Sequence, residues 1–526
     1  MPFRNAQPHR ESFRPNYIEM TEVLWLAMNK AAITQQELES WLWGAADILR
    51  GPVDPGNFRD FIFPMLFLKR LSDTWDDEHG AAVAEWGDDL DDEIAADFHK
   101  FDIPAGCHWN DLRRAAENHG VLIQEITQRI EQANPDRLAG IFGNASWADP
   151  NRMPPERLVR LIEHFNRYVI SPTNVPNDML GAGYEYLLKS FSDENAVSAG
   201  QFFTPRSVIH LLIQILDPQP TDTIYDPACG SAGMLIESAN AVMAAGKSIA
   251  QMRFYGQEVN QTSSAIGRMN LYIHDVDDAQ IVRGDTLRDP KFVDERGKLR
   301  TFDVVIANPP FSLKDWGQEN WATDAHRRSE YGGVPPKGQG DMAWIQHMLT
   351  SATTGTGRVG VVMPHGVLFR SGAEAKIRQH LLEHDLLDAV IGLGNNLFYG
   401  TSIPACLMIF RKTKNPENAG KVRIIDGSKR FQSGRNQNTL TDDDVAALFE
   451  AYNDPTAEPD RVKQATIDIA DSEANGWDLN LGRYIEQDAA ETIDVGTALA
   501  AMAEAEQVTA AAQAALHERL KAAGYA

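Results

Sequence analysis

At 526 residues the chain is long enough for two to four domains, and its 43% hydrophobic and 23% charged residues exclude a largely disordered or fibrous protein. No apolar run reaches the roughly 18–20 residues that span a bilayer, and no secretory signal is visible, so we expect a cytoplasmic protein with no membrane segment. Three cysteines are too few for a disulfide framework, so we expect reduced thiols. The formal net charge of −25 disfavours a protein that binds DNA alone, because phosphate neutralisation supplies most of that affinity; contact with DNA would need a local basic cleft or a partner that supplies the positive surface.

The first predicted region is helical. From about Thr34 to Tyr168 the apolar residues recur at helical spacing. The two clearest apolar stripes are Leu38, Leu42, Ala45 and Leu49, and Phe58, Phe61, Ile62, Met65 and Leu66. Nothing in this region indicates chemistry, so we predict an α-helical N-terminal domain over residues 1–170 that serves packing or docking.

The pattern changes from about Asn174 to Arg411, where short β-rich runs alternate with helical stretches. These runs are Thr223–Tyr225, Arg253–Gly256, Gln280–Arg283, Phe302–Ala307, Arg358–Met363, Leu386–Ile391 and Ala405–Phe410. Strands that alternate with helices predict an α/β domain with a doubly wound, mostly parallel sheet, here over residues 171–430. In such sheets ligands bind at the carboxyl ends of the strands.

The last region is mixed. One more strand is predicted at Val422–Ile425 and a helix at Asp442–Tyr452. The Ala-rich stretch Asp494–Ala523 has apolar residues near heptad spacing, which favours a helical tail that docks onto another helix over self-association. We therefore assign residues 431–526 to a C-terminal region with a partner-docking helix.

The first chemical signal is TIYDPACGSAG, residues 223–233. A strand ends at Tyr225, and small residues follow before a helix that begins near Met234. Gly230 and Gly233 allow a tight turn and a close approach of the backbone to a ligand, at which the helix N-terminus points its amides. Such a turn is equally compatible with plain turn chemistry, so its context has to decide.

Acidic residues follow the next two strands. RFYG runs into Gln257 and Glu258, and an acidic residue at the end of the second strand is where a nucleoside ribose is held through its hydroxyls. The strand QIVRG leads to Asp285, placed to meet an adenine edge; the alternative for a single such residue is a helix N-cap or a loop charge. Acidic residues at two successive strand ends, after a Gly-rich turn, favour an adenosine-type cofactor.

The decisive signal is FDVVIANPPF, residues 302–311, in which a buried strand runs into Asn308, Pro309, Pro310 and Phe311. Proline restricts the residue before it and lacks an amide donor, so the Asn308 amide and the Pro309 carbonyl are left as acceptors at the strand end. This arrangement suits a planar exocyclic amine, with Phe311 over the ring face. The alternative is a Pro-rich turn that closes the strand, with Phe311 in the core.

Taken in order, DPACGSAG, Glu258, Asp285 and NPPF resemble the S-adenosylmethionine-dependent amino-methyltransferases. AGQFFTPR, residues 199–206, is similar to the segment that closes over the methionine end of the cofactor in DNA adenine methyltransferases. LRGPVDPGNFRDFIFPMLFLKRLSD, GYEYLLKSF and GWDLNLGRYI resemble segments of modification subunits of type I restriction–modification systems, so the resemblance covers nearly the whole chain. The chain departs from the family pattern at Ala232, where the family often has glycine. Alanine adds only one methyl group to the turn, so this departure puts little of the resemblance in doubt.

The resemblance implies a Rossmann-like domain that transfers a methyl group from S-adenosyl-L-methionine to adenine N6 in DNA, with the target base flipped out of the duplex and no metal. The residues that it implies for cofactor binding are Gln201, Phe202, Phe203, Thr204, Pro205, Arg206, Asp226, Gly230, Ser231, Ala232, Gly233, Glu258 and Asp285. Glu258 would bind the ribose and Asp285 the cofactor's adenine. The implied catalytic residues are Asn308, Pro309, Pro310 and Phe311, of which Asn308 and Pro309 hold the amine and Phe311 stacks on the base.

The segment after this motif, residues 314–341, is rich in Gly, Pro, Trp and charge. This composition suits a mobile loop that folds over the base or the DNA, and a disordered surface insertion is the alternative. Its predicted phosphate contacts are Arg327, Arg328 and Lys337.

The resemblance implies double-stranded DNA as the substrate. A separate specificity subunit is the expected partner, because the chain is acidic and the region after Phe410 is too short for a large target-recognition domain. A second modification subunit and a translocating restriction subunit are implied by the resemblance alone. Two other function classes remain open at this point: an amino-methyltransferase that acts on cytosine N4, RNA or protein glutamine, and a non-catalytic scaffold.

Overall fold

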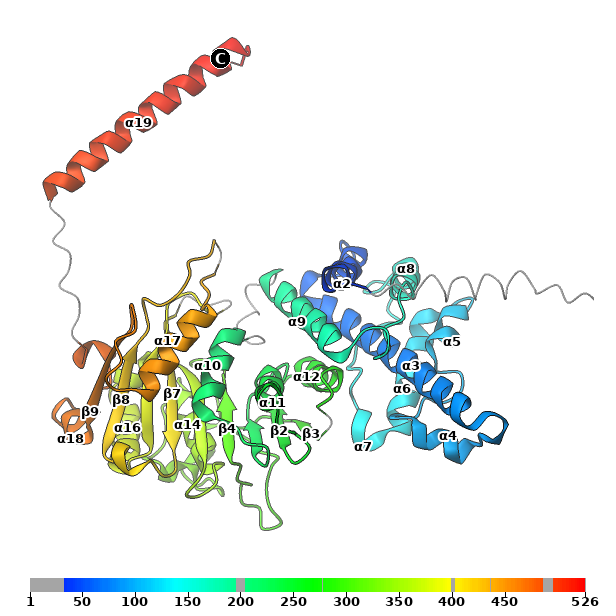
Figure 1. Cartoon of the computed structure of the whole chain (residues 1–526), viewed down its shortest axis with the longest axis horizontal. Helices are drawn as coiled ribbons and strands as arrows, with labels where there is room; N and C mark the ends of the chain where they lie inside the picture. Colours follow the sequence, from blue (N-terminus) through cyan, green and yellow to red (C-terminus); the bar gives the residue numbers. More distant parts are fainter. Residues whose placement is uncertain are drawn as a thin grey trace, which may run out of the picture. The chain divides into compact units, whose positions relative to one another are not determined.

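Figure 1 shows the computed structural model of the chain, which describes residues 33–194, 204–276, 278–398, 403–435, 437–485 and 495–525. The chain divides into two compact units, Met1–Leu479 and Asn480–Ala526. None of the helices in the described ranges is long and apolar enough to cross a membrane.

The N-terminal part of the first unit is helical, as predicted. Its elements are α2 (Gln35–Leu49), η1 (Pro55–Asn57), α3 (Phe58–Trp86), η2 (Gly87–Asp89), α4 (Asp92–Phe98), α5 (Trp109–Arg114), α6 (His119–Ala133), α7 (Pro135–Leu138), α8 (Pro155–Phe165) and α9 (Asn177–Glu194). Helix α2 begins in a capping box, in which the Thr34 hydroxyl accepts from the Glu37 amide and the Glu37 carboxylate accepts from the Thr34 amide. Both predicted apolar stripes are buried, which confirms the helical spacing.

These helices share one hydrophobic core with a helix of the sheet domain, α12 (Gln261–Ile273). Ile266, Met269 and Ile273 of α12 lie in the same buried cluster as the N-terminal helices. The Tyr184 hydroxyl on α9 donates to the Ile266 carbonyl over 2.9 Å, and its ring packs 4.4 Å from that of Phe63 between centroids. Helix α9 is therefore fixed against the sheet domain.

The sheet has nine strands in the order β3-β2-β1-β4-β5-β7-β6-β8-β9. The strands are β1 (Thr223–Asp226), β2 (Arg253–Glu258), β3 (Ala279–Arg283), β4 (Val304–Ala307), β5 (Arg358–Pro364), β6 (Leu387–Gly392), β7 (Ala405–Arg411), β8 (Lys421–Asp426) and β9 (Lys463–Asp468). All eight predicted strands are present, and the doubly wound α/β class is confirmed. The antiparallel pairings are β5–β7, β6–β7 and β8–β9, so the sheet is mixed but mostly parallel.

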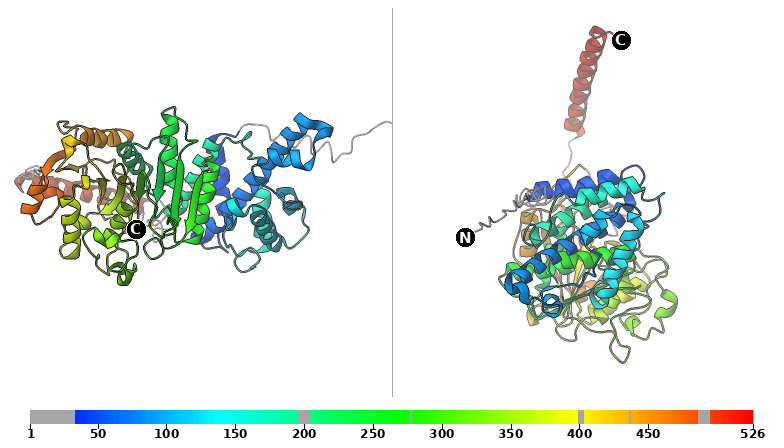
Figure 2. Two further views of the ribbon diagram at one scale, coloured as in Figure 1. Left: turned by 90° about the horizontal axis from the view of Figure 1, so that it is seen from below. Right: turned by 90° about the vertical axis from the view of Figure 1, so that its right-hand side faces the viewer.

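Helices cover both faces of this sheet. Helices α10 (Arg206–Leu216), α11 (Gly233–Ala244), α12 and α17 (Asp442–Asn453) lie on one face, and α14 (Asp341–Thr350) and α16 (Ala373–Glu383) lie on the other (Figures 1 and 2). The shorter elements are α13 (Gln318–Trp321), η4 (Arg328–Glu330), α15 (Gly366–Phe369), η5 (Pro416–Asn418) and α18 (Ile469–Ala474). The strand order reverses between β1 and β4, and ligands bind beside such a point at the carboxyl ends of the strands.

Part of the segment after NPPF is packed, so a disordered surface insertion does not describe it, and its movement over the base or the DNA stays a prediction. Trp316 and Trp321 are each 1% exposed. Arg328 is 2% exposed, because its guanidinium pairs with Asp324 and donates to the carbonyl of Leu287. Its prediction as a phosphate contact is therefore wrong: the buried partners take up the donors that a phosphate would need.

The second unit contains η6 (Leu481–Arg483) and the 28-residue helix α19 (Val495–Ala522). The apolar side chains of α19 are exposed along its length; they are Leu499, Met502, Val508, Leu516 and Leu520. The predicted helical tail is thus present, and its docking stays a prediction.

Candidate active site

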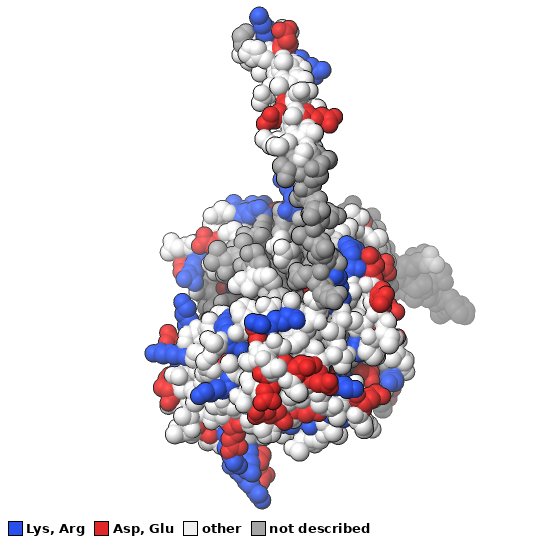
Figure 3. Space-filling model, turned by 90° about the vertical axis from the view of Figure 1, so that its left-hand side faces the viewer, with Lys and Arg blue, Asp and Glu red and all other residues white. Residues whose placement is uncertain are grey.

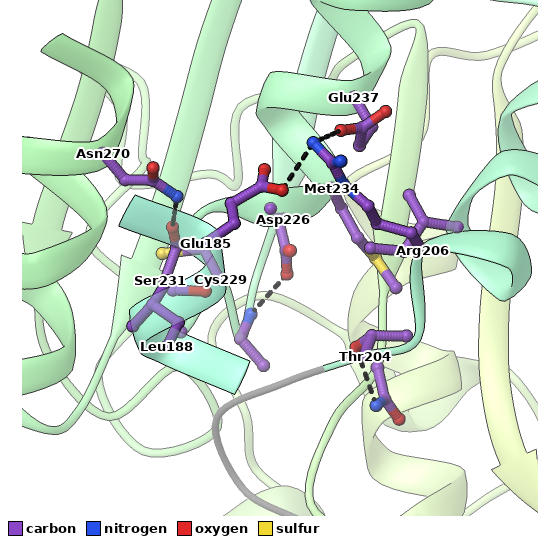
Figure 4. A pocket seen from close by; sticks show the side chains of 15 residues that line it. Glu185, Leu188, Thr204, Arg206, Asp226, Cys229, Ser231, Met234, Glu237 and Asn270 are labelled. Atoms are coloured by element: carbon purple, nitrogen blue, oxygen red, sulfur yellow. Dashed lines mark hydrogen bonds and ion pairs between the residues drawn. The ribbon is translucent and has the colours of Figure 1, made fainter. Parts of the chain in front are cut away.

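The carboxyl ends of β1 and β4 border a cleft that is partly open to solvent (Figure 4). Helices α9, α10, α11 and α12 contribute the remaining walls. The predicted site residues that line the cleft are Thr204, Arg206, Asp226, Gly230, Ser231, Gly233 and Asn308. Three segments that are far apart in the sequence therefore meet at one place. Gln201, Phe202 and Phe203 lie outside the described residues.

The turn after β1 is held by hydrogen bonds to the end of β2. The Cys229 amide donates to the Gln257 carbonyl over 3.1 Å, and the Gly230 amide donates to the Glu258 carboxylate over 3.0 Å. Helix α12 packs so closely behind the turn that a side chain at Gly267 would meet the Gly230 carbonyl at 2.8 Å. The turn is therefore held from both sides, by β2 and by α12, and Gly230 and Ser231 line the cleft.

Asp226 ends β1 in a fully enclosed position. Its carboxylate accepts from the Ala228 amide over 3.0 Å. Burial raises the pKa of Asp226 to about 8, with the charge of Glu258 adding to the effect.

Ala232 adopts a left-handed conformation, with φ of 63°, as the N-cap of α11. Its side chain is buried, and the cost lies in the backbone rather than in the extra methyl group, because a Cβ atom disfavours this region. This refines the sequence-based view, which considered only the added methyl group.

Replacing Ala232 with glycine is expected to raise the free energy of unfolding by about 1 kcal/mol, because glycine adopts positive φ without the Cβ penalty. The matched control is Ala241→Gly in the same helix, which is expected to lower stability by about 1 kcal/mol, since that position is helical. Chemical denaturation of the full chain measures both values. A loss of stability in Ala232→Gly would contradict the prediction.

Glu258 and Asp285 follow their strands as predicted but do not line the cleft. The two oxygens of Glu258 accept from the amides of Gly230 and Asn260, and burial raises its pKa. Asp285 accepts from the amides of Leu287 and Arg288, each over 3.1 Å, which is the capping geometry that the sequence left open as the alternative. Glu258 is thus tied to the cleft through the turn, and Asp285 stands further away.

Asn308 follows the end of β4 and lines the cleft. Its side-chain Nδ2 donates to the Thr204 hydroxyl over 2.9 Å, so the NPPF and AGQFFTPR segments touch. Pro309 is buried, and Phe311 is half-buried with its ring centroid 6.3 Å from that of Phe398. One side of the Phe311 ring therefore rests on the sheet domain.

The sequence reasoning missed an ion-pair network at the rear of the cleft. Glu185 on α9 and Glu237 on α11 both pair with the Arg206 guanidinium, and His210 reaches the second oxygen of Glu237 over 2.9 Å. Burial raises the pKa of Glu185 to about 7. The available signal was an acidic residue within the largely apolar segment GYEYLLKSF, one residue after Tyr184.

Comparison with known proteins gives a consistent result. Residues 175–492 match the family model described as N-6 DNA Methylase, and residues 38–165 match the HsdM N-terminal domain. The chain is 30% identical over 381 residues to the type I restriction enzyme HindI methylase subunit of Haemophilus influenzae, covering 69% of this chain and 82% of that protein. It is 28% identical over 482 residues to the MjaIX methylase subunit of Methanocaldococcus jannaschii, covering 85% and 84%.

A solved structure is similar over nearly the same range. The type I restriction–modification methyltransferase subunit from Streptococcus thermophilus matches with a TM-score of 0.75 at 26% identity, covering 86% of this chain and 100% of that one.

Proposed function

The chain belongs to the N-6 DNA methylase family and, within it, to the type I restriction enzyme methylase subunits, and from this premise we propose that the cleft at the end of β1 is its active site. The protein is an adenine-specific DNA methyltransferase, and S-adenosyl-L-methionine is its methyl donor. The observation that carries the site assignment is the contact of Asn308 with Thr204, which joins NPPF to the cleft lined by the DPACGSAG turn.

The residues around the cleft fit this cofactor. The cleft lies at the carboxyl ends of β1 and β4, where the strand order reverses, which is where doubly wound sheets bind nucleotide-like ligands. The guanidinium of Arg206 and the carboxyl groups of Asp226 and Glu185 line the cleft, and these groups suit the carboxylate and the ammonium of a zwitterionic amino-acid end. Glu258 lies one hydrogen bond behind the turn, where we assign it to the ribose, and we assign Asp285 to the cofactor's adenine. When bound, the cofactor supplies a methyl group activated by the sulfonium.

The chain's own residues then align the target amine. Asn308 Oδ1 and the Pro309 carbonyl accept the two N–H groups of adenine N6, and Phe311 covers the face of the base. Because a stacked adenine cannot reach the cleft, the base is flipped out of the duplex. Catalysis is mainly alignment of the nitrogen with the methyl carbon, and alignment of this kind accounts for several kcal/mol of a typical barrier.

As a methylase subunit, the protein acts on DNA within a multisubunit enzyme. We assign the choice of target sequence to a specificity subunit, because the net charge is −25 and the Lys and Arg side chains on the face in Figure 3 are interspersed with Asp and Glu. We propose that residues 1–170 and the exposed apolar side chains of α19 dock onto it, with residues 171–430 as the methyltransferase domain and residues 431–526 as the docking region. A second modification subunit and a restriction subunit complete the proposed complex, in the cytoplasm.

Sequence-specific methylation is expected to need the specificity subunit. The experiment compares the isolated chain with the chain co-expressed with the specificity subunit, by sequencing DNA for N6-methyladenine. We expect methylation at one defined sequence only with the partner, and at less than about 1% of that level without it, because the acidic chain holds DNA weakly alone. Full sequence-specific methylation by the isolated chain would contradict the partner assignment; no methylation with any partner would contradict the site assignment.

A further inference from the structure

Helix α9 brings an acidic side chain to the cleft. Gly183, Tyr184 and Glu185 are consecutive, and successive residues of a helix point about 100° apart, so they face three different neighbours. A side chain at Gly183 would meet Leu42 of α2 at 2.8 Å, and the Tyr184 hydroxyl donates to α12. Glu185 and Leu188, about one turn apart, line the cleft. The packing of α9 against α2 and α12 therefore fixes where the Glu185 side chain meets the cleft.

The Glu185 carboxyl group keeps acceptor capacity. Its Oε2 pairs with the Arg206 guanidinium over 2.5 Å, and its Oε1 lies 3.8 Å from Nε2 of His274, beyond hydrogen-bond distance. His274 uses its other ring nitrogen, Nδ1, for the Asn270 carbonyl over 2.9 Å, and burial lowers its pKa. Because the neutral ring then carries its hydrogen on Nδ1, Nε2 has none to donate to Glu185. Oε1 can therefore accept from a ligand in the cleft.

The other two described carboxyl groups that line the cleft are less available to a ligand. Glu237 uses both of its oxygens, Oε1 for Arg206 over 3.0 Å and Oε2 for His210 over 2.9 Å. Asp226 is only 2% exposed, and its carboxylate already accepts from a backbone amide of the turn. The side chain of Glu185 is 12% exposed and has one oxygen without such a commitment, which makes it the carboxylate that a bound cation would reach.

The surroundings of Glu185 favour a second positive group. Burial raises its pKa to about 7, and the charge of Arg206 opposes this only in part. The ionised carboxylate therefore retains a desolvation cost, which an added cation would offset. An α-amino acid carries its ammonium and its carboxylate on one carbon atom, so a site that binds both needs an acidic and a basic side chain next to each other. Glu185 and Arg206, which extend toward each other from separate segments, supply this combination (Figure 4).

We propose that the Glu185 carboxylate binds the α-ammonium group of S-adenosyl-L-methionine, beside Arg206, whose remaining N–H groups suit the α-carboxylate. The inference rests on the proposed function of the cleft and adds a contact to the cofactor residues that the resemblance implies. It also makes binding of the amino-acid end depend on α9, and hence on the packing of α9 against the N-terminal helix α2.

The test compares two ligands by calorimetry on the full chain: S-adenosylhomocysteine, and its analogue that lacks the α-amino group. Glu185→Gln is expected to weaken binding of S-adenosylhomocysteine about 10- to 100-fold, the range for a hydrogen bond between charged groups. The analogue has no ammonium, so it is expected to bind the variant within about threefold of wild type. Because Glu237 still holds Arg206 in the variant, the carboxylate contact that both ligands share is retained.

The matched control is Asp178→Asn, which removes the same charge from an exposed position of α9 and is expected to bind both ligands as wild type does. Unchanged binding of S-adenosylhomocysteine to Glu185→Gln would overturn the inference. Equal weakening of both ligands would also overturn it, because that result indicates a structural role for Glu185. A wild-type chain that binds neither ligand would instead overturn the proposed function of the cleft.

Discussion

Replacing Asn308 with alanine is expected to reduce methyl transfer about 10³-fold, the cost typical of losing a group that acts on the reacting atoms. The substitution removes the side-chain acceptor at the end of β4 and leaves only the Pro309 carbonyl to hold the amine. The measurement is single-turnover transfer from labelled S-adenosyl-L-methionine in the complex with the specificity subunit.

Cofactor affinity separates this effect from misfolding. Asn308 contacts the cleft at its mouth through Thr204, whereas the turn residues around Gly230 are held by β2 and α12. S-adenosylhomocysteine is therefore expected to bind Asn308→Ala within about threefold of wild type. The matched control is Asn415→Ala, at an exposed position before η5, which is expected to retain full activity. An active Asn308→Ala enzyme would remove the basis of the catalytic assignment and favour the scaffold class.

Replacing Arg328 with methionine is expected to lower the free energy of unfolding by about 3–5 kcal/mol, the usual cost of leaving one member of a buried ion pair alone. Two hydrogen bonds of 2.8 Å join its guanidinium to Asp324, and its guanidinium carbon Cζ lies 3.9 Å from the Trp321 ring centroid. Burial raises the pKa of Asp324, but the hydrogen bonds and charge of Arg328 outweigh burial and leave that pKa below its usual value. The variant would therefore bury an unpaired carboxylate.

The neighbouring arginine provides the control for this prediction. Arg327 is 75% exposed and pairs with Glu330 at the surface, so Arg327→Met is expected to cost less than about 0.5 kcal/mol. Guanidinium denaturation of the full chain measures both variants, and adding Asp324→Asn to Arg328→Met is expected to recover part of the loss. Equal stability of the two arginine variants would contradict the burial argument.

The strands were predictable because most of them are apolar runs, which a buried sheet requires. Strand β9 was missed because KQATID reads as polar: it pairs only with β8 at the sheet edge, and Ile467 is its one buried side chain. The packing of the segment after NPPF was also missed. Arg328 pairs with the nearby Asp324, but its burial also depends on the carbonyl of Leu287, and that of Trp321 on Gln346. Local composition does not indicate such distant partners.

Part of the candidate site was also predictable from the sequence, and part of it was not. The DPACGSAG turn and NPPF each combine special backbone requirements with chemistry over a few residues, so the sequence alone identified them. The role of Glu185 depends on α9 folding back onto α12, and the contact of Thr204 with Asn308 joins positions 104 residues apart. Such pairings are decided by tertiary packing, and a single sequence does not display them.

The core that α12 shares with the N-terminal helices affects how genetic screens for subunit docking are read. Two family matches meet in this core, and α12 begins only three residues after Glu258. A substitution at Met269 or Ile273 would disturb the helices and the cofactor turn together. Loss of restriction or modification in such a mutant therefore identifies no partner surface, and only exposed positions can map one.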